Sequence, residues 1–71
     1  MIDTLISVES SNVSRVGYDN DAHTLHVEFK NGSAYQYFDV PKSVYEGILN
    51  AGSAGQYLNQ VIKGSYRYAR V

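Results

Sequence analysis

The stretch HTLHVEFKNGSAYQYF, residues 23–38, decides the fold. Apolar and polar residues alternate along its first half, and the apolar ones are Leu25, Val27 and Phe29. This alternation is typical of a strand with one buried face. Asn31-Gly32 follows, which is the strongest short hairpin signal in the chain. The stretch therefore predicts a β-hairpin, and the loop decides which face carries Tyr35 and Tyr37.

Two loops are compatible with these residues. A two-residue loop, Asn31-Gly32, would pair Lys30 with Ser33 and place both tyrosines on the polar face. A three-residue loop that includes Lys30 would pair Phe29 with Ser33 and place them on the apolar face. One residue of register turns every side chain to the other face. We favour the three-residue loop because it separates apolar from polar residues better, although it leaves Phe38 on the polar side. The tyrosines are then mainly core, with hydroxyls that reach the rim.

The segments on either side predict one earlier strand and two later helices. Residues 11–21 are strand-like and end in the turn formers Asp19, Asn20 and Asp21. Pro41 suits the first position of a helix that Gly52 ends, with an apolar stripe of Val44, Tyr45, Ile48 and Leu49. Ser53 can cap a second helix that runs to about Lys63 and ends at Gly64, with Tyr57, Leu58, Val61 and Ile62 facing inward. The tail, with alternating Tyr66 and Tyr68, is a candidate extra strand.

We expect one α+β domain over residues 1–71. It is a three- or four-stranded antiparallel meander followed by two short helices packed on one face. The predicted core consists of Leu25, Val27, Phe29, Tyr35, Tyr37, Ile48, Leu49, Leu58 and Ile62. The apolar residues near the N-terminus either complete this core as an edge strand or pack against a second copy in a homo-oligomer; they are Ile2, Leu5, Ile6 and Val8.

Composition excludes several chemistries. The 71 residues include no cysteine, so disulfides and thiolate metal sites are ruled out. His23 and His26 would point to opposite faces of a strand, and Asp19 with Asp21 begins a turn rather than a calcium loop. We see no nucleophile context, signal peptide or apolar run of membrane-spanning length. We therefore expect a soluble, cytoplasmic protein without catalytic residues, metal, cofactor or membrane partner.

Several co-linear segments resemble the KTSC domain, over roughly residues 8–68. They are SSNVSRVGYD, TLHVEFKNGSAYQYFDVP, VYEGIL and SAGQYLNQVIKG, and the hallmark Tyr-x-Tyr corresponds to Tyr35-Gln36-Tyr37. The resemblance implies a domain that occurs at the C-terminus of some lysyl-tRNA synthetases and as small stand-alone proteins of bacteria and phages. It implies no catalytic residues, and RNA binding has been suggested for the family because of the synthetase association.

Two segments are candidates for ligand binding. AGSAG, residues 51–55, precedes a helix, so Gly52, Ser53 and Gly55 could offer backbone N–H groups to a phosphate. After Glu46 the chain has no acidic residue and three basic ones, which are Lys63, Arg67 and Arg70. Tyr66 and Tyr68 are interleaved with them, and single-stranded nucleic acid binds to this combination of rings and cations. A tight connection between two helices would also produce the AGSAG pattern. A short strand packed on the sheet would also produce the pattern of alternating tyrosines and cations.

The function we favour from sequence is a non-catalytic binding module for RNA or a nucleotide. The formal net charge of −1 counts against an extended nucleic-acid surface. One alternative is a phage or bacterial oligomer that sequesters a small (cyclic) nucleotide signal. The other is a protein–protein interaction module.

Overall fold

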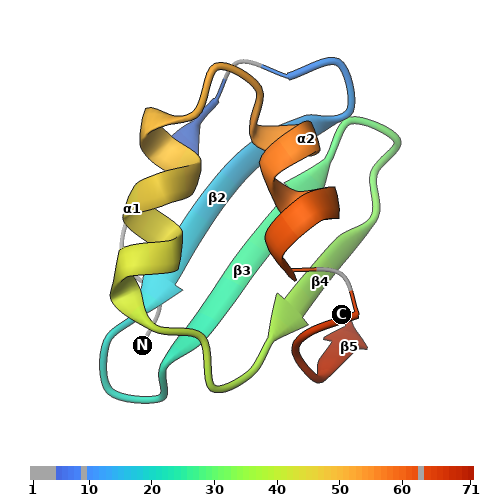
Figure 1. Ribbon diagram of the computed structural model, residues 1–71. Helices are drawn as coiled ribbons and strands as arrows, with labels where there is room; N and C mark the ends of the chain where they lie inside the picture. The colour runs from blue at the N-terminus through green and yellow to red at the C-terminus, as the bar shows by residue number, and fades with distance from the viewer. Residues whose placement is uncertain (1–4, 9, 63) are drawn as a thin grey trace.

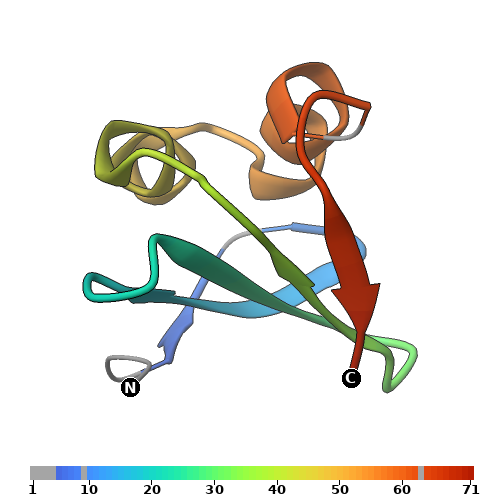
Figure 2. The same ribbon diagram turned by 90° about the horizontal axis from the view of Figure 1, so that it is seen from below.

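The computed structural model describes residues 5–8, 10–62 and 64–71. A single antiparallel sheet has the strand order β1-β2-β3-β4-β5, so each strand lies next to its neighbours in sequence (Figure 1). The strands are β1 Ile6–Ser7, β2 Val13–Asp19, β3 Thr24–Phe29, β4 Ala34–Tyr37 and β5 Tyr68–Arg70. The helices are α1 Lys42–Asn50 and α2 Ala54–Tyr57, which continues as the π-helix η1 Leu58–Ile62. Both lie on one face of the sheet (Figure 2).

This architecture confirms the predicted α+β class, with two differences. The sheet has five strands because both ends of the chain add short edge strands, β1 beside β2 and β5 beside β4. Of the N-terminal apolar residues, Ile6 lies in the edge strand β1 but is 42 % exposed, and Val8 packs against the core. Ile2 lies outside the described residues. The helices lie between β4 and β5 along the chain, so they precede the last strand rather than ending the fold.

The β3–β4 loop has the three-residue form. Leu25 pairs with Tyr37 and Val27 with Tyr35, so both tyrosines are on the apolar face. The Phe29 N–H donates to the Ser33 carbonyl at 2.8 Å, and the Gly32 N–H donates to the Phe29 carbonyl at 3.1 Å. Gly32 has a φ of +92°, where a residue with a Cβ is strained. The favoured register is confirmed, and its turn depends on the glycine.

Replacing this glycine should therefore cost stability. We expect Gly32→Ala to lower the free energy of unfolding by about 1–2 kcal/mol, because the left-handed region disfavours a Cβ. The control is Gly52→Ala, since Gly52 has open space around it and needs no left-handed backbone. Urea unfolding of both variants checks this. Equal losses in the two would contradict a special role for Gly32.

The core lies between the sheet and the helices. Tyr18 on β2 stacks on Tyr45 of α1, with ring centroids 5.5 Å apart, and donates its hydroxyl hydrogen bond to the Val40 carbonyl. Ile48, Leu58 and Ile62 bring both helices onto the same layer. Of the nine predicted core residues, six are fully buried: Leu25, Val27, Tyr37, Ile48, Leu58 and Ile62.

Three predicted core residues are less enclosed. Phe29 and Tyr35 are half-buried and pack against the edge of the core. The prediction for Leu49 is wrong, because its side chain is 36 % exposed. The short helix turns only Tyr45 and Ile48 fully inward, and Leu49 lies on its flank beside the edge strand β1.

The helix ends follow the predicted residues closely. Pro41 stands one position earlier than predicted, as the N-cap in an extended conformation, because α1 begins at Lys42. Helix α1 also ends before Gly52, with Ala51 as its C-cap. Ser53 caps α2 by accepting a hydrogen bond from the Gln56 N–H at 3.4 Å. Gly64, with a φ of +85°, follows the π-helix and turns the chain toward β5.

The two helices approach each other at Gly47. A Cβ at this position would lie 2.6 Å from the ring Cζ of Tyr57, closer than real carbon atoms approach. We expect Gly47→Ala to destabilise the domain by about 1–3 kcal/mol through overpacking. In a Tyr57→Ala background the same change should be neutral or stabilising, since alanine favours a helix over glycine by about 1 kcal/mol. A double-mutant cycle in urea measures the coupling, and additive effects would refute the contact.

Candidate functional site: an aromatic cleft beside the last strand

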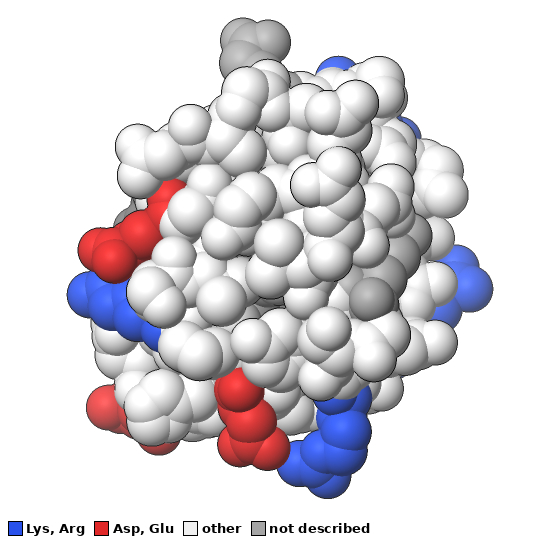
Figure 3. Space-filling model, viewed as in Figure 1, with Lys and Arg blue, Asp and Glu red and all other residues white. Residues whose placement is uncertain are grey.

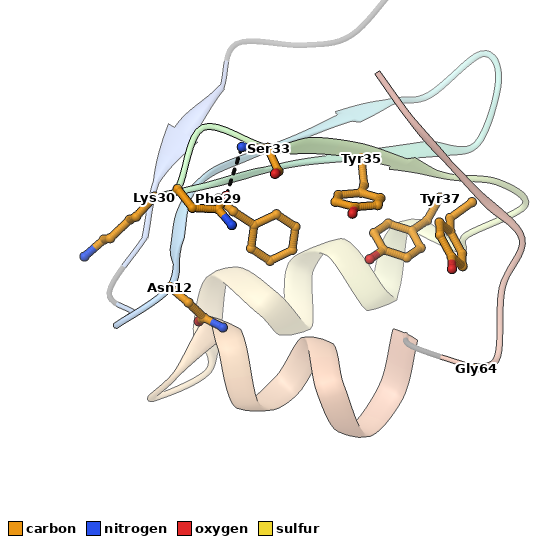
Figure 4. Close-up of a pocket in the computed structure, with 9 residues that line it drawn as sticks. Asn12, Phe29, Lys30, Ser33, Tyr35, Tyr37 and Gly64 are labelled. Carbon is orange, nitrogen blue, oxygen red and sulfur yellow. Dashed lines mark hydrogen bonds between the residues drawn. The ribbon is translucent and has the colours of Figure 1, made fainter.

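One cavity of the described structure is lined by residues of the β3–β4 hairpin, by Tyr68 of β5 and by Gly64 after the π-helix. Its volume is about 630 Å³. Its walls are Asn12, Phe29, Lys30, Asn31, Ser33, Tyr35, Tyr37, Gly64 and Tyr68, and we call it the aromatic cleft. The labelled rings project from the sheet toward the helices (Figure 4).

Strand pairing brings the four rings of the cleft together. Tyr35 and Tyr37 are two residues apart on β4, and Tyr68 on β5 pairs with Tyr37, so all three share a face. The Tyr68 ring centroid lies 5.8 Å from that of Tyr35 and 5.7 Å from that of Tyr37. The Phe29 ring meets Tyr35 edge-on at 5.7 Å. These spacings are typical of interacting aromatic pairs, so the rings form one connected cluster.

The cluster changes from core to surface across its width. Tyr37 is only 3 % exposed and belongs to the core, whereas Tyr68 is 61 % exposed. Burial raises the pKa of the Tyr37 hydroxyl above its usual value, and the neighbouring Tyr35 and Tyr68 reinforce the shift. Tyr37 therefore stays protonated at neutral pH. The cleft has a rigid wall at Tyr37 and an accessible one at Tyr68.

Polar groups gather at the hairpin end of the cleft. Arg70 pairs with Tyr35 across the strands, so its side chain leaves the same face, and its guanidinium donates to the Ser33 Oγ at 3.2 Å. The Ser33 N–H donates to the Asn31 Oδ1 at 2.9 Å, and the Lys30 N–H donates to the Asn12 carbonyl at 2.8 Å. The Arg70 guanidinium thus lies at the hairpin end of the cleft. Lys30 also lines the cleft, but its ammonium group points away from the rings (Figure 4).

The structure divides the predicted C-terminal site. Tyr68 lines the cleft, and Arg70 lies at its margin, where it donates to Ser33, whereas Tyr66 is half-buried against the core. Arg67 points elsewhere: it donates to Asp39 at 3.2 Å and its guanidinium carbon lies 5.9 Å from the Phe38 ring centre. Lys63 lies outside the described residues.

The AGSAG loop is occupied by packing contacts. Gly55 is buried, and a Cβ there would meet the Asn12 side chain and lie 2.8 Å from the Ser10 Oγ. The Ser53 hydroxyl already accepts from Gln56, while Gly52 is exposed. The loop does not line the cleft, and its contact with Asn12 connects it to the cleft wall only indirectly.

The opposite face of the sheet has a small polar network. The Arg15 Nε donates to Glu28 at 2.9 Å, and the His26 Nε2 lies 3.3 Å from the other Glu28 oxygen. The Arg15 hydrogen bond holds the pKa of Glu28 below its usual value, and His26 adds to the effect. His23 lies in the β2–β3 turn with a φ of +52° rather than on the strand. Among the described residues, no three His, Asp or Glu side chains gather as metal ligands, and neither helix has the length and hydrophobicity to cross a bilayer.

Comparison with known proteins identifies the family. The model of the KTSC domain matches residues 9–66. The chain belongs to the KTSC domain family. A solved structure of a KTSC domain protein from Yersinia pestis has a TM-score of 0.88 and 32 % identity, with 96 % of each chain covered. This KTSC domain protein therefore shares the fold described here.

Relatives of this KTSC domain are of two sizes. A lysine–tRNA ligase of Nostoc punctiforme is 40 % identical over 67 residues, which are 94 % of this chain but 12 % of that protein. An uncharacterized protein of Stutzerimonas stutzeri is also 40 % identical over 67 residues, which cover 93 % of this chain and 94 % of the relative. The KTSC domain is thus both a small part of long proteins and almost the whole of short ones.

Sequence reasoning did not assign most of the cleft to a site. Asn12, Lys30, Asn31 and Ser33 were read only as strand or turn residues, and Phe29, Tyr35 and Tyr37 mainly as core. One signal was available in the favoured register, because it places the three rings in adjacent positions on one face. The register does not show where the helices lie. In the structure they leave the β4–β5 side of that face open.

Two tyrosines of the cleft should differ sharply in their structural importance. We expect Tyr37→Ala to cost about 3 kcal/mol of unfolding free energy, because it empties a fully buried position. Tyr68→Ala should cost less than about 1 kcal/mol, because its ring is mostly in solvent. Thermal unfolding followed by circular dichroism tests this. A Tyr68 variant as unstable as the Tyr37 variant would show that the cleft is closed core rather than an accessible surface.

Proposed function

We propose that this KTSC domain is a non-catalytic binding module for a nucleotide unit. The unit is either a free small nucleotide or one or two unpaired residues of an RNA. The observation that carries the proposal is the cluster of four rings beside Arg70 in an open cleft of about 630 Å³. Ligand pockets commonly have volumes of about 300–1,000 Å³ and combine apolar walls with a few polar groups.

The base would stack against the accessible part of the cluster. Tyr68 and Tyr35 present ring surface that the helices do not cover. The ring of Tyr68 packs against those of Tyr35 and Tyr37. Stacking on an aromatic side chain is worth about 1–3 kcal/mol per base and tolerates any base. The Asn12 and Asn31 side chains supply amide groups for hydrogen bonds to a base or sugar edge.

The phosphate would lie at the hairpin end of the cleft. The guanidinium of Arg70 donates a hydrogen bond to Ser33, and a guanidinium has five N–H donors, so others can face a phosphate. An arginine can bind two phosphate oxygens at once through its planar fork. Lys30 lines the same end of the cleft, and its ammonium group would have to turn toward the phosphate to add a second positive charge.

The charge distribution favours a short ligand over a long one. Figure 3 shows that, for the described residues, the charged side chains on the helical face lie around its margin and leave its centre neutral. The formal net charge is −1. A long nucleic acid needs a track of cations, since each neutralised phosphate contributes to affinity. The cleft instead has the single guanidinium of Arg70 at its hairpin end, among the described residues, with the Lys30 ammonium directed away from the rings.

The relatives support an RNA as one source of the nucleotide. A lysine–tRNA ligase is, by its name, a protein that acts with tRNA, and a KTSC domain forms a small part of it. The short relatives, such as the protein of Stutzerimonas stutzeri, have no such partner in their names. The binding experiment therefore compares both sources.

We expect the purified chain to bind either mononucleotides such as AMP and UMP or single-stranded ten-residue RNAs in isothermal titration calorimetry. Arg70→Ala and Tyr68→Ala should each weaken the binding by about tenfold or more. The matched control is Arg67→Ala, which removes an exposed arginine of the same segment that faces Asp39 rather than the cleft. It should leave the dissociation constant within about twofold.

The salt dependence of the affinity distinguishes binding of an RNA from binding of a free mononucleotide. RNA bound through one or two phosphates should lose affinity with a slope of about −0.7 to −1.4 in a log–log plot against salt. Tight binding of a mononucleotide would identify a small-molecule pocket. No binding to any nucleotide, or equal losses in the Arg67 and Arg70 variants, would overturn the proposal and favour a protein partner.

A further inference from the structure

The last strand leaves one row of its backbone groups unpaired with β4. The Phe38 N–H donates to the Arg67 carbonyl and the Val71 N–H donates to the Ala34 carbonyl, both at 2.9 Å. In an antiparallel ladder, the residues that exchange hydrogen bonds alternate with those that do not. Ala69, which pairs with Gln36, therefore directs its N–H and C=O toward β4. Tyr68 and Arg70 direct theirs to the outer edge.

This outer edge is accessible. The strand order ends at β5, and none of the described elements lies beyond it in the two ribbon views (Figures 1 and 2). All three residues of β5 are exposed. An unprotected edge of this kind is a template for pairing with another strand, and proteins usually block it with proline, lysine or a bulge. β5 contains no proline or lysine, and its register with β4 is regular.

We propose that β5 pairs with β5 of a second copy of this chain, antiparallel and centred on Ala69. In this register, Tyr68 of each copy lies opposite Arg70 of the other, and these two pairs exchange all the outward hydrogen bonds of the strand. Ala69 lies opposite Ala69 of the second copy, on the two-fold axis. The two five-stranded sheets become one continuous sheet.

Complementarity selects this register over its neighbours. A shift of two residues in one direction places Arg70 opposite Arg70 of the second copy, and like charges directly opposite are destabilising. A shift in the other direction places Tyr68 opposite itself and leaves Arg70 beyond the strand of its partner. The Ala69 register instead brings each Arg70 guanidinium next to a Tyr68 ring on the same face of the sheet. A cation is attracted to the face of such a ring.

The pairing also changes the cleft. The two-fold axis of such a strand pair is perpendicular to the sheet, so both aromatic clefts open on the same side. Tyr68 lies 61 % exposed at the border of its own cleft. The second copy places its Arg70 beside this ring and thereby adds a cation to the rim of the first cleft. The pairing rests on the geometry of β5 alone and does not depend on the proposed function.

A single cysteine tests the register directly, because the chain has none of its own. The pair at the axis does not exchange hydrogen bonds, so its Cα atoms would be about 4.5 Å apart. This distance is within the range of about 4.4–6.8 Å that a disulfide spans. We expect Ala69→Cys to form a covalent dimer rapidly under mild oxidation. The control is Ala22→Cys, an exposed alanine in the β2–β3 turn, which should remain mostly monomeric.

The second experiment measures association without a cross-link. Sedimentation of the unmodified chain should show a monomer–dimer equilibrium as concentration rises. Ala69→Lys should weaken dimerisation by about tenfold or more, since two lysines would lie opposite each other. Ala69→Thr, an uncharged strand former, should dimerise like the parent.

The outcomes separate this proposal from the nucleotide proposal. A chain that is monomeric at all concentrations, or a dimer that Ala69→Lys leaves unchanged, would overturn the edge pairing while leaving the nucleotide titrations valid. A dimer with normal cross-linking and no nucleotide binding would support the pairing and overturn the proposed function.

Discussion

The hydrogen bond from the Phe29 N–H to the Ser33 carbonyl sets the register on which the rest of the structure depends. It closes the three-residue loop and pairs Val27 with Tyr35, so the tyrosines of β4 join the apolar face. With the other register, the same side chains would point away from the helices. The core, the ring cluster and the position of β5 beside β4 all follow from this one choice. It is stabilised by one glycine with a positive φ.

The same register explains why part of the apolar face stays uncovered. The helices need Tyr18, Ile48, Leu58 and Ile62 to pack, and these residues gather over the middle of the sheet. On β4 and β5 burial decreases outward: Tyr37 belongs to the core, Tyr35 is half-buried beside Phe29, and Tyr68 is mostly exposed. A domain of 71 residues has too little helix to cover five strands. The cleft is therefore a result of size as well as of sequence.

Local patterns predicted the hairpin, both helices and most of the core, because each depends on residues close in the chain. The turn followed from Asn31-Gly32 together with the alternation on either side, and the second helix from Ser53 and Gly64. Leu49 was misassigned because a helical stripe does not reveal which of its members faces the sheet. The cleft could not be predicted, since it joins residues from Asn12 to Tyr68 whose proximity depends on how the layers pack. Arg67 and Arg70 looked equivalent in sequence, and only the pairing of β5 separates them.

The gradient of burial across the ring cluster has a consequence for how such a domain can diverge. Tyr37 serves the core and the cleft at once, so its replacement would sacrifice folding together with any recognition. Tyr68, Arg70 and Lys30 are at the surface, where most substitutions are nearly neutral for stability. New specificities can therefore arise by exchange of the outer residues alone, on a scaffold that stays constant. Under the proposed nucleotide binding, such a domain could change its ligand without a change in its core.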